Sequence, residues 1–218
     1  MTATALRSFT SYTPLREATF KSDGGPLPSA ARVVLITEGE GNRRDRNYYS
    51  GDALRNSYKA FEGRKSFLDH PSKSEEQDLP ERSVTEQCGW LANVELGSLD
   101  GRTAILADLV FGKNTAASEA RSLIESALQY QAQYPAGDDV FVGLSINASG
   151  PSHEELIGGE AWNVVEGIES VFSVDLVTFP ARGGKALAFK ESQAFRRAFE
   201  SQVWRDRFTA VLRVADAA

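Results

Sequence analysis

The feature that most restricts the fold is a series of short apolar or alternating runs joined by turn-forming residues. The clearest pair covers residues 87–96 and 103–111, and the segment between them, GSLDG, has the glycines and aspartate typical of a hairpin turn. We therefore expect two antiparallel strands at 87–111. The sequence lacks the regular strand–helix alternation of a doubly wound fold, so it favours a mostly antiparallel sheet.

Further strands and helices follow from the same kind of pattern. Five more runs predict strands: 31–37, 67–71, 140–150, 162–165 and 171–178. Three segments with apolar residues at helical spacing predict helices: 52–61, 115–134 and 191–213. Ser50 is expected to cap the first helix, and Asn114 or Thr115 the second. The polar segments 38–49, 72–85 and 151–159 are expected to be loops.

Seven or so strands with three helices indicate an α+β fold, in which a mostly antiparallel sheet or barrel packs against helices. A chain of 218 residues, 41% hydrophobic and 25% charged, is expected to form one main domain at 29–190. A flexible arm at 1–28 is expected before this domain, and an amphipathic helix and tail at 191–218 after it. A net charge of −6 with no basic stripe argues against nucleic acid as a partner.

Cysteine and histidine counts restrict the chemistry. Cys88 is the one cysteine, so no internal disulfide forms, and one cysteine with two histidines cannot build a Cys/His zinc site. We therefore expect no metal, and a reducing compartment such as the cytoplasm. The N-terminus lacks the apolar core of a secretory signal and no run reaches membrane-spanning length, so we expect neither export nor a membrane partner.

The run at 140–150, VFVGLSINASG, alternates apolar residues with small polar ones, which places Ser145 on the polar face of a half-buried strand. A glycine lies two residues before Ser145, as in a nucleophile elbow, but that motif needs a second glycine where this chain has Asn147. The sequence therefore disfavours an α/β-hydrolase. Because most strand serines are packed or solvated hydroxyls, Ser145 is a candidate nucleophile only if partners lie nearby.

A serine nucleophile needs a base, and the chain offers His70 and His153. His70 lies between an apolar strand end and a proline, so it is the better candidate, with a structural histidine as the alternative. His153 is expected in a polar loop with a solvated side chain. Asp175 lies in the run SVFSVDLVTF, where an unpaired carboxylate would be costly to bury. It therefore needs a partner, which is the imidazole of a triad, an arginine or a backbone amide.

Three segments together resemble the prohead maturation proteases of tailed bacteriophages: LDHP around His70, VGLSINASG around Ser145 and SVFSVDLVTFPA around Asp175. The upstream segment GNRRDRNYYSGDAL is similar to the one that precedes the histidine in that family. The resemblance covers residues 33–187. It implies the fold of herpesvirus assemblin, a mostly antiparallel β-barrel surrounded by helices.

Carried over by position, the resemblance implies that Ser145 is the nucleophile, His70 the general base and later the general acid, and Asp175 the group that orients the imidazole. Herpesvirus relatives have a second histidine in the third role, so the acidic version belongs with the phage branch. Arg182 and Gly183 correspond to a loop that helps to form the oxyanion hole in this fold, with a turn between strand and helix as the alternative. No metal or organic cofactor is implied.

The implied function is that of a serine endopeptidase that cleaves scaffold protein, segments of the major capsid protein and itself inside the prohead, in the cytoplasm of the host bacterium. The alternative is a non-catalytic scaffold or capsid-assembly protein with the same fold. Assemblin-like proteases act as dimers, whereas phage members need not. An apolar stripe is expected either to pack on the barrel or to join two subunits as a homodimer: Phe195, Phe199, Phe208 and Leu212.

Overall fold

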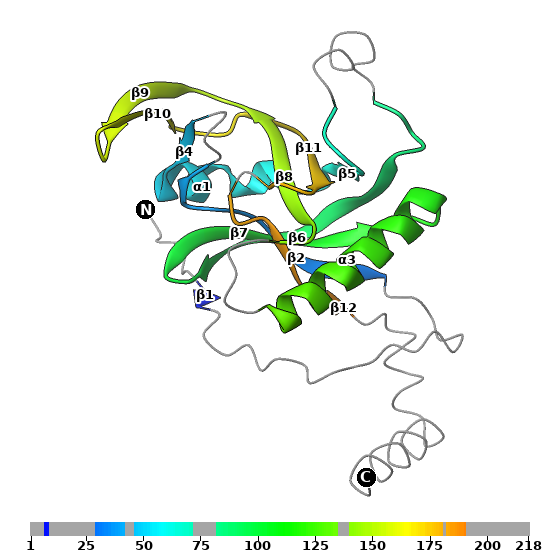
Figure 1. Cartoon of the computed structure of the whole chain (residues 1–218). Coiled ribbons are helices and arrows are strands. Elements are labelled where there is room, and N and C mark those ends of the chain that lie inside the picture. The colour runs from blue at the N-terminus through cyan, green and yellow to red at the C-terminus, as the bar shows by residue number, and fades with distance from the viewer. Residues whose placement is uncertain are drawn as a thin grey trace, which may run out of the picture.

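The structure is a computed structural model that describes residues 7–8, 29–41, 46–71, 82–134, 140–180 and 182–190 (Figure 1). Most of its strands pair antiparallel. The strands are β1 (Arg7–Ser8), β2 (Ala30–Thr37), β3 (Gly39–Glu40), β4 (Asn47–Tyr49), β5 (Lys65–Phe67), β6 (Gln87–Leu99), β7 (Arg102–Phe111), β8 (Gly143–Ser149), β9 (Ser152–Ile157), β10 (Glu160–Val165), β11 (Ser170–Val177) and β12 (Lys185–Lys190). The helices are α1 (Gly51–Ser57), the short 3-10 helix η1 (Tyr58–Phe61) and α3 (Thr115–Gln133). The expected α+β class with mostly antiparallel sheets is confirmed.

The largest sheet has the strand order β1-β6-β7-β2-β12, with β5 also paired to β6. Residues 100–101 form a two-residue turn between β6 and β7, which confirms the predicted hairpin, although β6 continues to Leu99. Strand β2, the predicted first strand, pairs with β7 on one side and with β12 on the other. Strand β12 is not among the predicted strands, because its sequence KALAFK is only partly buried and its partner lies near the other end of the chain.

Backbone contacts join the small β8–β11 sheet to the large sheet at two places. On one side, the amide of Leu144 in β8 donates to the carbonyl of Gly184, just before β12, at 3.2 Å. On the other side, Leu68 forms a parallel bridge with Leu176 in β11, and the amide of Asp69 donates to the Leu176 carbonyl at 2.9 Å. The segment that follows β5 therefore runs alongside β11.

The third sheet has the order β3-β4-β10-β9, and its β9–β10 hairpin extends to the upper left of Figure 1. The loops predicted at 38–49 and 151–159 are wrong in part, because β3 and β4 lie in the first segment and β9 lies in the second. The sequence of β9, SHEELI, does not alternate apolar with polar residues, and nearly all of its residues are exposed, so its pattern does not predict a strand. Its hydrogen bonds to β10, rather than burial, hold it in place.

The predicted helix caps are present. Ser50 Oγ accepts a hydrogen bond from the amide of Ala53 at 3.1 Å, so α1 begins where expected, and η1 continues the predicted helix to Phe61. Asn114 Oδ1 accepts from the amide of Ala117 at 3.1 Å and caps α3 in the same way. Four alanines on the buried face, which also includes Ile124, let α3 lie close to β6, β7 and β12 (Figure 1): Ala116, Ala117, Ala120 and Ala127.

The main hydrophobic core draws on β2, β4, α1, η1, β6, β7, α3, β8, β11 and β12, so these elements form one packed unit. The predicted helix at 191–213, with its stripe of Phe195, Phe199, Phe208 and Leu212, lies outside the described residues, as does the arm at 1–28 apart from β1. Of the predicted loop at 72–85, residues 72–81 also lie outside them. No helix in the described part of the chain is long and apolar enough to cross a bilayer.

Candidate active site

Ser145 and Asp175 lie directly opposite each other on the paired strands β8 and β11. Directly opposite residues of an antiparallel pair project their side chains to the same face of the sheet, so the hydroxyl and the carboxylate are neighbours. Both residues are buried, with 6% of Ser145 and none of Asp175 exposed. A simple alternation of apolar and polar residues suggests that Ser145 lies on a solvated face. In the structure it lies in the interior beside a carboxylate.

Within the part of the chain that the structure describes, one oxygen of Asp175 accepts all of its hydrogen bonds. Asp175 Oδ2 accepts from His70 Nδ1 at 2.7 Å, from Ser173 Oγ at 2.9 Å and from Arg82 Nη1 at 3.2 Å. The second oxygen, Oδ1, is buried and has no hydrogen-bond partner among the described residues. A fully buried carboxylate is costly unless it is paired, and these donors supply the pairing. Two of the partners left open by the sequence, an imidazole and an arginine, are thus both present.

His70 reaches Asp175 because of the path that the chain takes after β5. Leu68 and Asp69 follow β11 through their backbone contacts with Leu176, which brings the next residue level with the carboxylate. Asp69 then adopts a positive φ of 60°, which turns the chain out of the strand direction. The His70 side chain is 36% exposed, so its imidazole lies between the buried carboxylate and the surface.

The hydrogen bond to Asp175 fixes the tautomer of His70. A carboxylate accepts and does not donate, so Nδ1 carries a proton, and in the neutral imidazole the lone pair is then on Nε2. Within the described residues, no hydrogen bond joins Ser145 Oγ to His70. Bonds of this kind are often long without substrate and tighten in the complex. The structure thus brings the three predicted residues to one place, with the His70–Asp175 half of the arrangement formed.

The other nucleophile and the other histidine are less suited to catalysis. Cys88 is buried, and its burial raises the pKa of the thiol to about 11, with a further upward contribution from the charge of Asp175. The thiol therefore stays protonated and unreactive near neutral pH. His153 lies on the exposed strand β9, where its Nδ1 bonds to Glu166 at 2.8 Å and its Nε2 lies 3.4 Å from Glu155. Its expected loop is a strand, and its side chain is engaged with surface glutamates.

Arg182 and Gly183 lie in the loop that connects β11 to β12. The guanidinium of Arg182 donates to the carbonyl of Glu38 through Nε and Nη2, each at 3.2 Å, and the Arg182 carbonyl accepts from the amide of Thr37 at 3.3 Å. Gly183 has a positive φ of 64°, a conformation that favours glycine. The loop is thus fastened to the end of β2, with the Arg182 side chain directed at a backbone carbonyl. The role of these two residues at an oxyanion stays a prediction.

The same loop lies against the strand that carries Ser145. The carbonyl of Gly184 accepts from the amide of Leu144, and a Cβ at Gly184 would overlap the Leu144 carbonyl oxygen. Only glycine allows two backbones to approach so closely. The residue before the candidate nucleophile is therefore fixed by this loop.

Arg82 is a site residue that the sequence does not single out. It lies at the end of a polar segment with no periodicity, and the contact with Asp175 joins residues 93 positions apart. The sequence analysis allows an arginine as a partner of Asp175, but nothing in it distinguishes this arginine from the others. No group of three or more His, Cys, Asp or Glu side chains within the described ranges is arranged to hold a metal ion. Comparison of the chain with protein-family models, curated proteins and solved structures gave no match.

Proposed function

We propose that this chain is a serine endopeptidase that uses Ser145 as nucleophile, His70 as general base and Asp175 as orienting group. The observation that carries the proposal is the position of Asp175, which lies opposite Ser145 in the strand register and holds His70 Nδ1 at 2.7 Å. A carboxylate on Nδ1 selects the tautomer in which Nε2 can accept the serine proton. Burial of the pair in a low-dielectric interior strengthens its electrostatic effect.

The reaction would proceed through an acyl-enzyme. His70 Nε2 takes the proton from Ser145 Oγ as this oxygen attacks the carbonyl carbon of the scissile peptide bond, and Asp175 stabilises the imidazolium. The imidazolium then gives its proton to the leaving amine as the C–N bond breaks. A water molecule, deprotonated by His70, attacks the resulting ester, and the proton returns to Ser145 Oγ as the carboxylic acid leaves. Backbone amides of the Arg182–Gly183 loop are the proposed oxyanion donors.

The strand contacts support an assemblin-like barrel. Seven strands follow one another in the order β2, β7, β6, β5, β11, β8 and β12, each in contact with the next. Pairing of β12 with β2 returns the series to its starting strand. A series that returns to its start leaves few free strand edges, as in a barrel.

The resemblance to prohead proteases supports the substrate class. We infer that the chain cleaves scaffold protein and segments of the major capsid protein, and also itself, inside the prohead in the cytoplasm of a host bacterium. A homodimer is compatible with this function and is not required by it. The rival is a non-catalytic capsid-assembly protein with the same fold.

A serine-reactive probe separates the enzyme from its non-catalytic rival. The full chain and its Ser145→Ala variant are incubated with a fluorophosphonate, and both are co-expressed with the scaffold and capsid genes of the same phage. Labelling of Ser145 and cleavage of scaffold, both lost in Ser145→Ala, are expected for a protease. Ser149→Ala, at an exposed position of the same strand, is the matched control and should keep both activities. A folded wild-type chain that neither labels nor cleaves would favour the rival.

A further inference from the structure

The guanidinium of Arg82 joins the two parts of the chain that build the candidate site. Arg82 Nη1 donates to Asp175 Oδ2 at 3.2 Å, and Nη2 donates to the backbone carbonyl of Asp69, the residue before His70, at 2.8 Å. The guanidinium carbon also lies 4.3 Å from the centre of the Phe67 ring in β5. The side chain is 13% exposed, so these contacts are largely shielded from water.

The backbone conformation at Arg82 is unusual for an arginine. Its φ of 61° lies in the left-handed region, which side chains with a Cβ seldom adopt. Asp69, whose carbonyl accepts from Arg82, has a φ of 60°. Such conformations persist when surrounding contacts hold them, and they are common at functional sites. Here they let one fork of donors meet both the carboxylate and the segment that carries His70.

The orientation of the Asp175 carboxylate depends on the hydrogen bonds of a single oxygen. All three donors bind Oδ2, whereas Oδ1 has no partner among the described residues. Rotation of the carboxylate about its Cβ–Cγ bond is therefore resisted only by the contacts of Oδ2. Ser173 holds Oδ2 from within β11, and Arg82 holds it together with the backbone at Asp69. An arginine fork fixes distance and direction at once, which a single point charge does not.

We propose that Arg82 is a positioning residue of this site, which locks Asp175 Oδ2 onto His70 Nδ1. This inference rests on the proposed function in so far as the lock serves catalysis. Arg82 does not touch the reacting atoms, because its two hydrogen bonds are to the orienting carboxylate and to a backbone carbonyl. Its loss should therefore slow the chemical step and leave probe binding almost unchanged.

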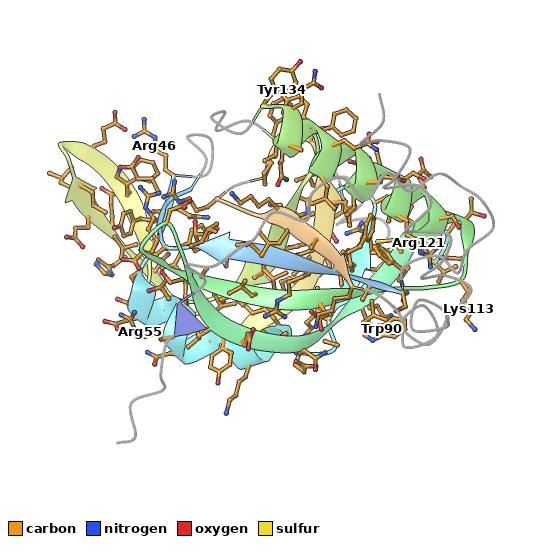
Figure 2. The ribbon with its side chains drawn as sticks, turned by 90° about the horizontal axis from the view of Figure 1, so that it is seen from below. Arg46, Arg55, Trp90, Lys113, Arg121 and Tyr134 are labelled. Carbon is orange, nitrogen blue, oxygen red and sulfur yellow. The ribbon has the colours of Figure 1, made fainter. Side chains whose placement is uncertain are left out.

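The test compares Arg82→Gln and Arg82→Lys with Arg121→Gln in the full chain. Arg121, which extends from α3 in Figure 2, has the same kind of structural contacts: it stacks on Phe111 at 5.0 Å and donates to the Gly112 carbonyl at 2.7 Å. These two partners of Arg121 are not residues of the candidate site. It therefore controls for the loss of a packed arginine as such.

Fluorophosphonate labelling gives the rate at saturating probe and the half-saturating probe concentration separately. For Arg82→Gln we expect the saturated rate to fall about 10- to 100-fold, with the half-saturating concentration within about twofold of wild type. Arg82→Lys should recover part of the rate, because an ammonium can still reach one of the two acceptors. Arg121→Gln should keep the wild-type rate. A wild-type rate in Arg82→Gln would overturn the inference, as would an equal loss in Arg121→Gln.

A second readout does not depend on activity. The proton on His70 Nδ1, held by Asp175, can be observed by NMR with ¹⁵N-histidine labelling. We expect its signal in wild type and Arg121→Gln and its loss or broadening in Arg82→Gln; an unchanged signal in Arg82→Gln would overturn the inference. If Arg82→Gln does not fold, Arg82→Lys is judged by the same criteria. If the signal is present in wild type and lost in Arg82→Gln, but the wild-type chain never labels, the proposed function is rejected and the positioning role of Arg82 stands.

Discussion

At the scale of single residues, the charge of Asp175 is the property on which the proposed chemistry depends. Asp175→Asn keeps the size of the side chain but removes the charge that stabilises the imidazolium and selects the His70 tautomer. We expect a fall in turnover on the order of a hundredfold or more, with a smaller change in the half-saturating substrate concentration. Steady-state cleavage of a scaffold-derived peptide measures both quantities.

His153→Ala is the control for this prediction. His153 lies on the exposed strand β9 and bonds to Glu166, so its removal should leave turnover nearly unchanged. A near-normal Asp175→Asn enzyme beside an inactive His153→Ala enzyme would reverse the assignment. It would place the chain with the two-histidine branch and leave Asp175 as a structural carboxylate.

Cys88 gives a prediction that is independent of catalysis. Burial, with a smaller contribution from Asp175, raises the pKa of its thiol to about 11, so both access and ionisation are low at pH 8. We expect iodoacetamide to leave the folded chain unmodified and to alkylate Cys88 fully in denaturant, as read by intact mass. Rapid alkylation of the folded chain at pH 8 would show that this part of the core opens easily.

At the scale of elements, the contact between the β11–β12 loop and β8 should be sensitive to a single methyl group. In Gly184→Ala the new Cβ would overlap the Leu144 carbonyl oxygen, so the loop or β8 must move. We expect a loss of about 1–3 kcal/mol in the free energy of unfolding, measured by urea denaturation, together with reduced labelling of Ser145.

Gly167→Ala is the matched control, because the nearest atom to a Cβ there is Ser57 Oγ at 3.9 Å. This variant should keep both stability and labelling. If Gly184→Ala is as stable and as reactive as Gly167→Ala, the loop does not fix the strand that carries Ser145.

Elements governed by local chemistry are those that the sequence predicts well. The caps at Ser50 and Asn114 and the hairpin turn at 100–101 depend on residues close together in the chain, and all three are present. Strands β9 and β12 are missed for a different reason. Their own residues are largely exposed or only partly buried, and pairing with another strand decides their conformation.

The candidate site also contains residues that the sequence predicts and one that it does not. His70, Ser145 and Asp175 carry recognisable local sequence, and the fold brings them together. Arg82 has no local pattern, so only the path of β5 and β11 reveals that it faces Asp175. The sequence also places Ser145 on a polar face, whereas the β8–β11 pairing buries that position.

At the scale of the whole molecule, Asp108 joins four strands of the large sheet. From β7 it accepts hydrogen bonds from Arg32 in β2 at 3.0 Å, from Asn93 in β6 at 2.7 Å and from Lys190 in β12 at 2.6 Å. Burial by itself would raise the pKa of this carboxyl, but the bonds from Lys190, Asn93 and Arg32 outweigh it and lower the pKa. The charged form of Asp108 is therefore favoured by folding.

This shift predicts an acid-sensitive contribution to stability. A carboxyl whose pKa is lower in the folded than in the unfolded chain stabilises the fold above the unfolded value, about 3.9, and loses that effect as the pH falls through the folded value. We expect Asp108→Asn to be clearly less stable than wild type at pH 7, with the difference shrinking toward pH 3. Urea denaturation at both pH values measures it.

Asp52→Asn is the comparison, since this carboxylate is exposed and pairs with Arg55 on the same helix. Exposed pairs contribute about 0–1 kcal/mol, so the variant should unfold almost as wild type at either pH. A stability difference between wild type and Asp108→Asn that stays constant from pH 7 to pH 3 would contradict the lowered pKa.

Synthesis from the N-terminus delivers the parts of the site in a fixed order. His70 leaves the ribosome first, Ser145 next, and Asp175, 105 positions after His70, last. The pairing partner of β2 is synthesised later still, because β12 ends at Lys190. A nascent chain therefore holds the base and the nucleophile without the carboxylate that joins them. The proposed peptidase activity therefore reaches its full level only after residues up to Lys190 have been synthesised.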